Sequence, residues 1–321
     1  LFKMILTDPS QADKKIKSKI LNSVTKIINS KQYILGKSVK SFESEFSKFC
    51  GSKYAIGVNS GTDALILSLM AIDIKYGDEI IIPSHSASGT ATAVLAVGAK
   101  PIFVDIDPDT FLIDIIDLKK KITKKTKVII PVHLYGQSCD ITKILEIANK
   151  NKIKIIEDCA QAHGTKFKNI HVGNFGVTGC FSFYPTKNLG AIGDGGCVIT
   201  NNNVIYEKIK ILRDFGWKKR FNSSIKGLNS RLDEIQAAIL RIKLRRLNQY
   251  NLKRKKIASK YFKKFSKHKY VKTPKLLNYS NHTFHQFVIK VPRNSRNKLI
   301  DFCKKKKILL GIHYPIPLHN Q

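Results

Sequence analysis

Short apolar runs alternate with amphipathic stretches over most of the first two hundred residues. The apolar runs predict strands at residues 55–58, 79–83, 101–105, 127–133 and 154–158. The stretches between them place apolar residues at helical spacing and predict helices at residues 62–71, 88–97 and 141–151. This alternation favours an α/β fold with a mainly parallel sheet, in which functional residues gather just after the strands.

The pattern changes after residue 180. Strands expected at residues 180–183 and 196–200 flank a glycine-rich loop, and a long basic helix is expected from near Arg231. The remaining pattern predicts a strand, a helix and a strand at residues 285–291, 296–306 and 308–314. We therefore expect a large domain over residues 1–240 and a smaller C-terminal α+β domain over residues 241–321.

Composition narrows the class of protein. The 321 residues are 43% hydrophobic, which suits a globular enzyme with a sizeable core. No run approaches the roughly 18 apolar residues of a membrane-spanning helix, and the first residues show no secretory signal. The six cysteines form no CxxC pair and have no nearby histidine at zinc spacing. We expect reduced thiols, a cytoplasmic location, no membrane partner and no metal site.

The formal net charge of +34 raises the question of a nucleic-acid partner. Residues 241–275 contain many Lys and Arg and no acid, but they also carry apolar residues at helical spacing. This pattern is typical of the solvated face of a helix, so we expect no nucleic-acid partner. The alternative, nucleic-acid binding through this helix, predicts salt-sensitive binding and no cofactor.

One lysine has an unusual local setting, in the segment GCFSFYPTKNLGAIGDGGCVIT, residues 179–200. Lys187 lies there in a glycine-rich loop between two apolar runs. A lysine that forms a Schiff base must be held in place and partly desolvated, because burial lowers the pKa of its amine. Lys187 is therefore a candidate catalytic residue, although a solvated surface lysine gives the same local pattern.

Two upstream segments supply an acid and an anion-binding turn. In KIIEDCAQAHG, a buried strand ends in Asp158, whose carboxylate needs a partner there. A helix N-terminus would serve, and so would the ring nitrogen of pyridoxal phosphate. In NSGTDALILSL, Ser60, Gly61 and Thr62 lead from a strand into a helix. The free amides at that point either bind a phosphate or are capped by Ser60 or Thr62.

Six segments, in order along the chain, resemble the DegT/DnrJ/EryC1/StrS family of sugar aminotransferases: YILGKSVKSFESEF, NSGTDALILSL, EDCAQAHG, SFYPTKNLGAIGDGG, GLNSRLDEIQAAIL and GIHYPIPLH. The resemblance implies the PLP-dependent transferase fold type I, like that of aspartate aminotransferase, with pyridoxal 5'-phosphate as cofactor. Family members continue beyond the position of Gln321, so the resemblance also implies a C-terminal domain that is truncated here.

The resemblance assigns roles to matching residues. Lys187 matches the lysine that binds the cofactor covalently and moves protons, and Asp158 matches the carboxylate at the pyridine nitrogen. Gln161 matches the neighbour of the cofactor's hydroxyl group. The other implied contacts are a phosphate site of Ser60, Gly61, Thr62, Ser182 and, from a second subunit, Asn229, and substrate-binding residues His163, His313 and Tyr314.

One position departs from the family pattern. Many members have an aromatic residue that stacks on the cofactor ring, where this chain has Ala87 in the segment PSHSASGT. His85, two positions earlier, either covers the ring or is a polar loop residue. We include His85 among the candidate cofactor-binding residues.

The resemblance implies transamination from L-glutamate to a nucleotide-linked keto-sugar, most closely a 3-keto hexose linked to dTDP or UDP. It also implies a homodimer with shared active sites. One alternative is a 4-keto-sugar aminotransferase, as in perosamine-type synthesis. An alternative of a different class is a non-catalytic regulatory or binding protein with the same fold. Related dehydratases have a histidine in place of the lysine, so Lys187 argues against that activity.

Overall fold

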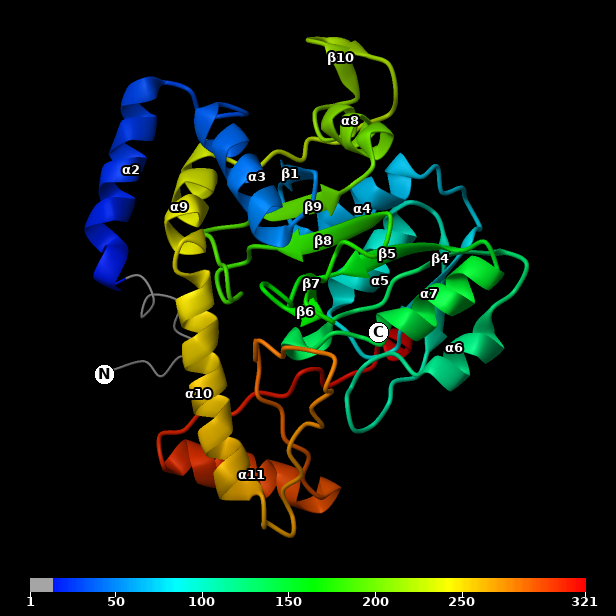
Figure 1. The fold of residues 1–321 in the computed structure, drawn as a ribbon, viewed down its shortest axis with the longest axis vertical. Helices are drawn as coiled ribbons and strands as arrows, with labels where there is room; N and C mark the ends of the chain where they lie inside the picture. The colour runs from blue at the N-terminus through cyan, green and yellow to red at the C-terminus, as the bar shows by residue number, and fades with distance from the viewer. Residues whose placement is uncertain (1–13) are drawn as a thin grey trace.

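A seven-stranded sheet forms the centre of the computed structural model, which describes residues 14–321 (Figure 1). Its strands have the order β1-β9-β8-β5-β4-β2-β3. β9 is antiparallel to both of its neighbours, and all other neighbouring pairs are parallel. The carboxyl ends of the other six strands therefore lie at one edge. The bounds are β1 Tyr54–Val58, β2 Glu79–Pro83, β3 Lys100–Val104, β4 Thr126–Ile129, β5 Lys154–Asp158, β8 Thr178–Ser182 and β9 Gly196–Thr200.

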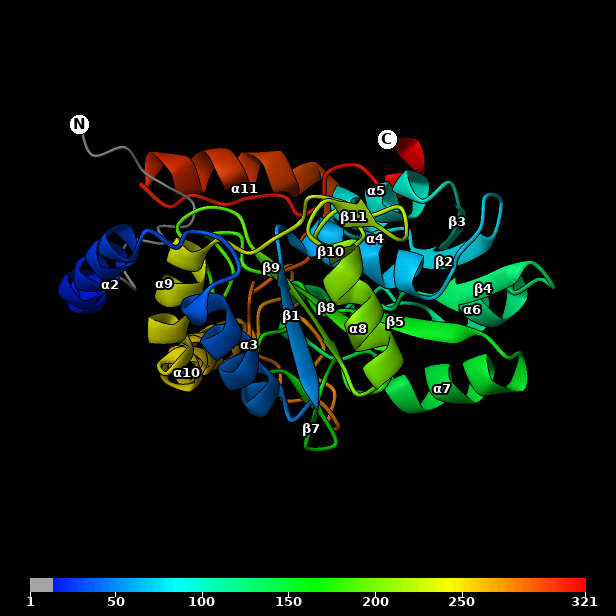
Figure 2. The ribbon, with the colours of Figure 1, turned by 90° about the horizontal axis from the view of Figure 1, so that it is seen from above.

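Helices cover both faces of this sheet (Figures 1 and 2). One face packs against α4 Gly61–Ala71, α5 Ser88–Ala96 and α8 Asn203–Leu212. The other packs against α3 Lys37–Cys50, α6 Ile115–Lys121, α7 Ile141–Lys150 and α9 Glu234–Leu244. The remaining elements are η1 Lys14–Ile16, α2 Lys17–Ser30, η2 Leu134–Gly136, β6 Lys166–Phe167, β7 Ile170–His171, β10 Trp217–Lys219, β11 Asn222–Ser223, α10 Leu247–Phe265, α11 Arg293–Lys305 and η3 Leu318–Asn320.

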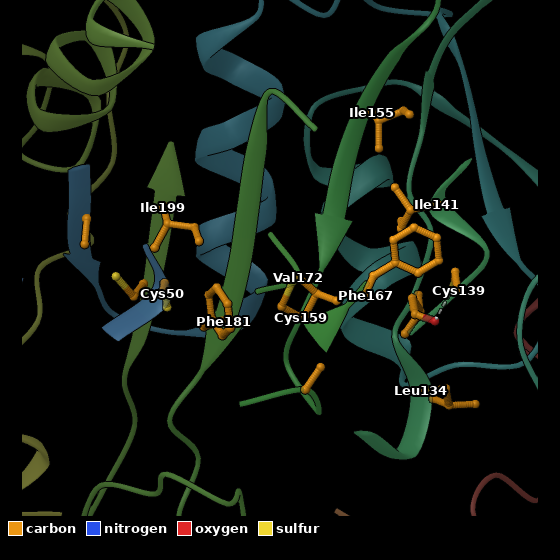
Figure 3. Close-up of a cluster of buried hydrophobic side chains, with 14 of the residues drawn as sticks. Cys50, Leu134, Cys139, Ile141, Ile155, Cys159, Phe167, Val172, Phe181 and Ile199 are labelled. Atoms are coloured by element: carbon orange, nitrogen blue, oxygen red, sulfur yellow. Dashed lines mark hydrogen bonds between the residues drawn. The ribbon is translucent and has the colours of Figure 1, made fainter. Parts of the chain in front are cut away.

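The strands are buried on both faces, because successive side chains point in opposite directions. Ile80 and Ile82 pack on the α4 side, whereas Ile81 packs on the α3 side. The α3 side includes Phe181 and Ile199 from the sheet and Ile141 from α7 (Figure 3). Burying one such side chain contributes about 1.5 to 3 kcal/mol. These apolar runs therefore fix the sheet between two helical layers.

The start of α3 is held by a residue from another helix. Gly36 provides no side-chain cap for α3. Instead the carboxylate of Glu234, at the start of α9, accepts hydrogen bonds from the backbone N–H groups of Ser38 at 2.8 Å and Val39 at 2.9 Å. Glu234 is only 2% exposed, so this contact fastens α9 to α3 inside the protein.

The expected α/β fold is confirmed, and several expected elements match closely. β2, β5 and β9 have the predicted bounds, whereas β4 ends at Ile129 rather than at residue 133. The basic stretch forms two helices, α9 and α10, rather than one. The break lies near Arg246, whose backbone N–H donates to the Lys243 carbonyl.

The strands expected at residues 285–291 and 308–314 are wrong, since neither stretch contains a named strand. They form no ladder with a neighbouring strand. Lys290 makes only an isolated bridge with Lys272, and Thr283, just before the first stretch, donates its backbone N–H to the Gly136 carbonyl at 2.8 Å. The expected domain boundary at residue 240 falls inside α9, and the division into two domains stays a prediction.

Two further findings concern the chain as a whole. Among residues 14–321, no helix combines the length and apolar character needed to cross a bilayer. All six cysteines are free thiols, and five of them are buried.

We expect Glu234→Ala to lower the free energy of unfolding by about 2 to 3 kcal/mol, because two buried N–H groups lose their acceptor. Urea denaturation would measure the change. Glu207→Ala is the matched control, because Glu207 is exposed and forms a surface ion pair with Lys210, three residues further along the same helix. The free energy of unfolding of this control should stay within about 0.5 kcal/mol of that of the unaltered chain. Equal losses in the two variants would contradict the role of Glu234.

Candidate active site

The candidate residues follow the carboxyl ends of four strands. Ser60, Gly61 and Thr62 come after β1, and His85 comes after β2. Asp158 is the last residue of β5 and Ser182 the last of β8, and Lys187 lies in the loop from β8 to β9. Because these strand ends share one edge, the sheet brings together segments that are far apart in the sequence.

Asp158 is a buried carboxylate with two hydrogen-bond donors. Its Oδ2 accepts from the Thr90 hydroxyl at 2.9 Å, and its Oδ1 accepts from the Ala160 backbone N–H at 3.1 Å. The Thr90 hydroxyl is also 3.0 Å from the Ser86 hydroxyl. Burial raises the pKa of Asp158, while both donors and the positive charge of Lys187 oppose that rise. These donors favour the ionised form.

Lys187 interacts electrostatically with this carboxylate. Burial lowers the pKa of the Lys187 amine, and the negative charge of Asp158 opposes the change only in part. A lysine of lowered pKa has a larger unprotonated fraction near neutral pH, and only that form is a nucleophile. Lys187 therefore has the property that a Schiff-base lysine needs.

Side chains from α9 and α10 hold the loop that carries Lys187. Gln236 of α9 accepts from the Ile192 N–H and donates to the Ile192 carbonyl, each at 2.9 Å. Lys243 donates to the Gly190 carbonyl at 2.9 Å. Asn188 donates to the Asn251 side chain of α10 at 3.0 Å. The loop is thus fixed just after the lysine, at residues 188, 190 and 192.

The turn before α4 is a tightly packed cradle. The Ser60 hydroxyl accepts from the Asp63 N–H at 3.0 Å, so it caps the helix. A Cβ on Gly61 would lie 2.7 Å from the Cβ of Ser182, so only glycine fits between α4 and β8. The amides at the start of a helix have no partner within that helix, so the turn suits an anion.

Gln161 links the end of β5 to the C-terminal segment. Its Oε1 accepts from the Tyr135 backbone N–H at 2.9 Å, and its Nε2 donates to the Tyr314 hydroxyl at 2.7 Å. Burial raises the pKa of Tyr314 to about 12. The Tyr135 hydroxyl donates to the His313 carbonyl and lies 2.9 Å from His85 Nε2. The structure thus brings four predicted residues, Gln161, Tyr314, His313 and His85, around Tyr135.

His163 and Asn229 occupy other settings. The His163 ring is completely buried near Phe181 and Phe183, and within residues 14–321 neither ring nitrogen has a hydrogen-bond partner. Burial and, to a lesser extent, the nearby charge of Lys187 lower its pKa to about 3. Asn229 is exposed at the base of the β10–β11 hairpin. Substrate contact by His163 and cofactor contact by Asn229 stay predictions.

A second buried cluster lies beside Asp158. His133 and Glu157 form a 2.9 Å pair, and with Cys159 they are close enough to hold a metal ion. However, both Glu157 oxygens already accept from backbone amides, those of Gly173 at 2.8 Å and of Phe175 and Gly176 at 2.7 and 2.9 Å. Burial raises the pKa of Glu157, but His133 and these amides outweigh it and lower the pKa overall. We interpret the cluster as a support for β5.

The residues fit pyridoxal phosphate. This cofactor requires a carboxylate for its ring nitrogen, an amine for its aldehyde and a binding site for its phosphate. Asp158 suits the pyridine nitrogen because its carboxylate is buried and hydrogen-bonded. Lys187 provides a partly desolvated amine, and the start of α4 provides a cradle that a Cβ on Gly61 would fill. The fold and the site together define an enzyme of the pyridoxal phosphate-dependent class.

Comparison with known sequences identifies the family. A profile of the DegT/DnrJ/EryC1/StrS aminotransferase family matches residues 14–321, so the chain belongs to this family. A dTDP-3-amino-3,6-dideoxy-alpha-D-galactopyranose transaminase of Aneurinibacillus thermoaerophilus is 43% identical over 98% of this chain and 86% of its own length. A pleiotropic regulatory protein of Geobacillus stearothermophilus is 40% identical over 98% of this chain and 85% of its own length.

Solved structures agree with this assignment. DesV of S. venezuelae, solved with a ketimine intermediate, superposes with a TM-score of 0.96 and 35% identity, covering 99% of this chain and 85% of that one. Other similar structures contain bound pyridoxamine phosphate or pyridoxal phosphate. Fold type I and pyridoxal phosphate as the cofactor of this family are therefore confirmed.

Three residues of the site were missed by the sequence analysis: Thr90, Ser86 and Tyr135. Ser86 and Thr90 lie shortly after β2, and Tyr135 lies in the loop after β4. All three thus follow the carboxyl end of a parallel strand, which is the signal that could have found them. Ser86 and Thr90 lie in the segment PSHSASGT, where the resemblance drew attention only to His85 and Ala87, and Tyr135 lies in none of the six matching segments.

Proposed function

We propose that this chain transfers an amino group from L-glutamate to a nucleotide-linked 3-keto sugar, with dTDP or UDP as the nucleotide. The observation that carries the proposal is the electrostatic pairing of Lys187 with the buried, hydrogen-bonded Asp158. The relative from Aneurinibacillus thermoaerophilus is named for a dTDP-linked 3-amino sugar, which supports the 3-keto position.

The chain's own residues account for the reaction. Bound pyridoxal phosphate supplies a cationic ring that withdraws electrons from the carbon that loses its proton. Asp158 keeps a proton on the ring nitrogen, because its ionised carboxylate favours the positive charge there. Lys187 would hold the cofactor through its Nζ, and the amino donor would displace Nζ from that bond. The freed Nζ amine would then take a proton from one carbon and return it to another. The start of α4 holds the phosphate.

Two alternative functions are distinguished from the proposed one by the experiments below. A 4-keto-sugar aminotransferase would use the same cofactor-binding residues but would aminate carbon 4 of the sugar instead of carbon 3. A non-catalytic regulatory protein is favoured by one observation: the Geobacillus stearothermophilus relative is named as a pleiotropic regulatory protein. The presence of both Lys187 and Asp158 argues for turnover, because a protein that only binds does not need an amine of lowered pKa.

A homodimer with shared active sites extends the proposal. Aromatic residues are exposed in the β10–β11 hairpin, where Phe221 is 76% exposed, and just before it, where Phe215 is 37% exposed; Asn229 lies at the base of the hairpin. Exposed aromatic residues are enriched at protein interfaces. In such a dimer, Asn229 would contact the phosphate of the partner's cofactor. We also propose a cytoplasmic location, which free and mostly buried thiols support.

We expect Lys187→Ala to abolish turnover and the visible absorbance of lysine-bound cofactor, because alanine has no amine to bind the cofactor or to move a proton. Absorbance spectra before and after L-glutamate would show this. Lys150→Ala is the matched control, because Lys150 is an exposed residue in the last turn of α7; it should keep both properties. Retention of turnover in Lys187→Ala would disprove the proposal, and a colourless unaltered protein incubated with the cofactor would favour the regulatory alternative.

The sugar position is tested with matched substrates. Unaltered protein would receive L-glutamate and either a 3-keto or a 4-keto sugar linked to dTDP or UDP. We expect mass spectrometry to detect amination of the 3-keto sugars at a rate at least about tenfold above that of the 4-keto sugars, which corresponds to roughly 1.4 kcal/mol in transition-state binding. A preference for the 4-keto sugars would select the perosamine-type alternative.

Shared sites are tested by mixing two inactive chains. Asn229→Asp should weaken cofactor binding, because an added negative charge would face the phosphate. In a mixed dimer with Lys187→Ala, one site would combine an intact Lys187 with an intact Asn229. Co-expression should therefore restore activity well above that of either variant alone. No recovery from a purified mixed dimer would show that Asn229 does not serve the partner's site.

A further inference from the structure

Tyr135 is the point where several candidate residues are joined, although it lies outside the sequence-predicted site. It belongs to η2, after β4, and is 3% exposed. Its backbone N–H donates to Gln161, and its hydroxyl contacts His313 and His85. Tyr135 thus contacts both His85, in the loop after β2, and His313, in the C-terminal segment.

The hydrogen bonds around the Tyr135 hydroxyl determine where the protons lie. A phenol has one proton, and a carbonyl oxygen can only accept. The Tyr135 hydroxyl therefore gives its proton to the His313 carbonyl. At 2.9 Å, the contact with His85 Nε2 can then be a hydrogen bond only if Nε2 carries the proton and donates to the phenol oxygen.

The other nitrogen of His85 is left as an acceptor. Burial lowers the pKa of His85, and the His313 carbonyl opposes that change only in part. The ring is therefore neutral near pH 7 and has a single proton, which the Tyr135 contact places on Nε2. Within residues 14–321, no group donates to Nδ1 of this half-buried ring. Its lone pair is available to a ligand.

We propose that Tyr135 is a positioning residue that fixes His85 as the Nε2–H tautomer and so presents His85 Nδ1 as a hydrogen-bond acceptor for a hydroxyl or ammonium group of a bound ligand. The proton on Nε2 follows from the two contacts of the Tyr135 hydroxyl, to the His313 carbonyl and to His85. The nature of the ligand, an amino donor or a sugar, depends on the proposed function.

Tyr135→Phe isolates the hydroxyl group. Tyr135 has a left-handed backbone conformation, with φ of 57°, and phenylalanine meets the same strain there as tyrosine. The ring and the backbone N–H to Gln161 are unchanged by this substitution. Only the contacts to His85 and His313 are lost, so an effect on His85 would come from the missing hydroxyl.

The test is two-bond 1H–15N NMR on cofactor-loaded protein labelled with 15N-histidine, with His85→Gln used to assign the His85 signals. We expect the unaltered chain to show Nε2–H and unprotonated Nδ1, and Tyr135→Phe to show averaging between the two tautomers. The control Tyr76→Phe, at a residue that is 92% exposed, should leave the signals of the unaltered chain. A proton on Nδ1 in the unaltered chain would overturn the proposal, and so would an unchanged pattern in Tyr135→Phe.

Kinetics add a second readout. If transamination occurs, Tyr135→Phe should reduce kcat/KM by about tenfold, mainly through KM for the ligand that donates to Nδ1, as expected for one weakened hydrogen bond. A fall in kcat alone would overturn the acceptor role. Absence of turnover in the unaltered chain would reject the proposed function instead, and the tautomer pattern would still be decided by NMR.

Discussion

The buried Asp158 carboxyl group is the constraint on which the arrangement of the site depends. A buried carboxylate without partners costs several kcal/mol, so the fold must supply donors and positive charge at the end of β5. Thr90 of α5 and the Ala160 amide supply hydrogen bonds, and Lys187 of the β8–β9 loop supplies charge. These groups meet only because β5 lies between β8 and β4 in the sheet, with β2 next to β4.

The strand that presents Asp158 is itself held from its other face. Successive residues of a strand point to opposite sides, so Glu157 faces away from Asp158. Glu157 has its own donors, the His133 ring and three backbone amides of residues 173–176. Two adjacent acids can end one buried strand because each has separate partners. Loss of the Glu157 contacts would free the end of β5 and so disturb the position of Asp158.

Much of the fold, and part of the site, could be predicted from the sequence because short segments of the chain were enough to indicate them. The apolar runs of β2, β5 and β9 set the strand bounds, and Lys187 and Asp158 lay in distinctive segments. The stretch 285–291 has a strand-like pattern, but a strand also needs a neighbouring strand to form hydrogen bonds with. The sequence of the stretch itself does not show whether such a neighbour exists. Tyr135 was missed because its role depends on Gln161 and His313, and His313 is 178 positions away.

The position of Ala87 shows how such distant contacts change a site. Members of the family often have an aromatic residue at this place, whereas here aromatic rings reach His85 from three separate segments. The ring centroids of Tyr314, Phe111 and Tyr135 lie 5.8, 6.4 and 6.4 Å from that of His85. An aromatic residue at position 87 would stack on the cofactor ring without any contact from the C-terminal segment. Because Tyr314 completes this cluster and also binds Gln161, the geometry on this side of the site depends on how that segment docks.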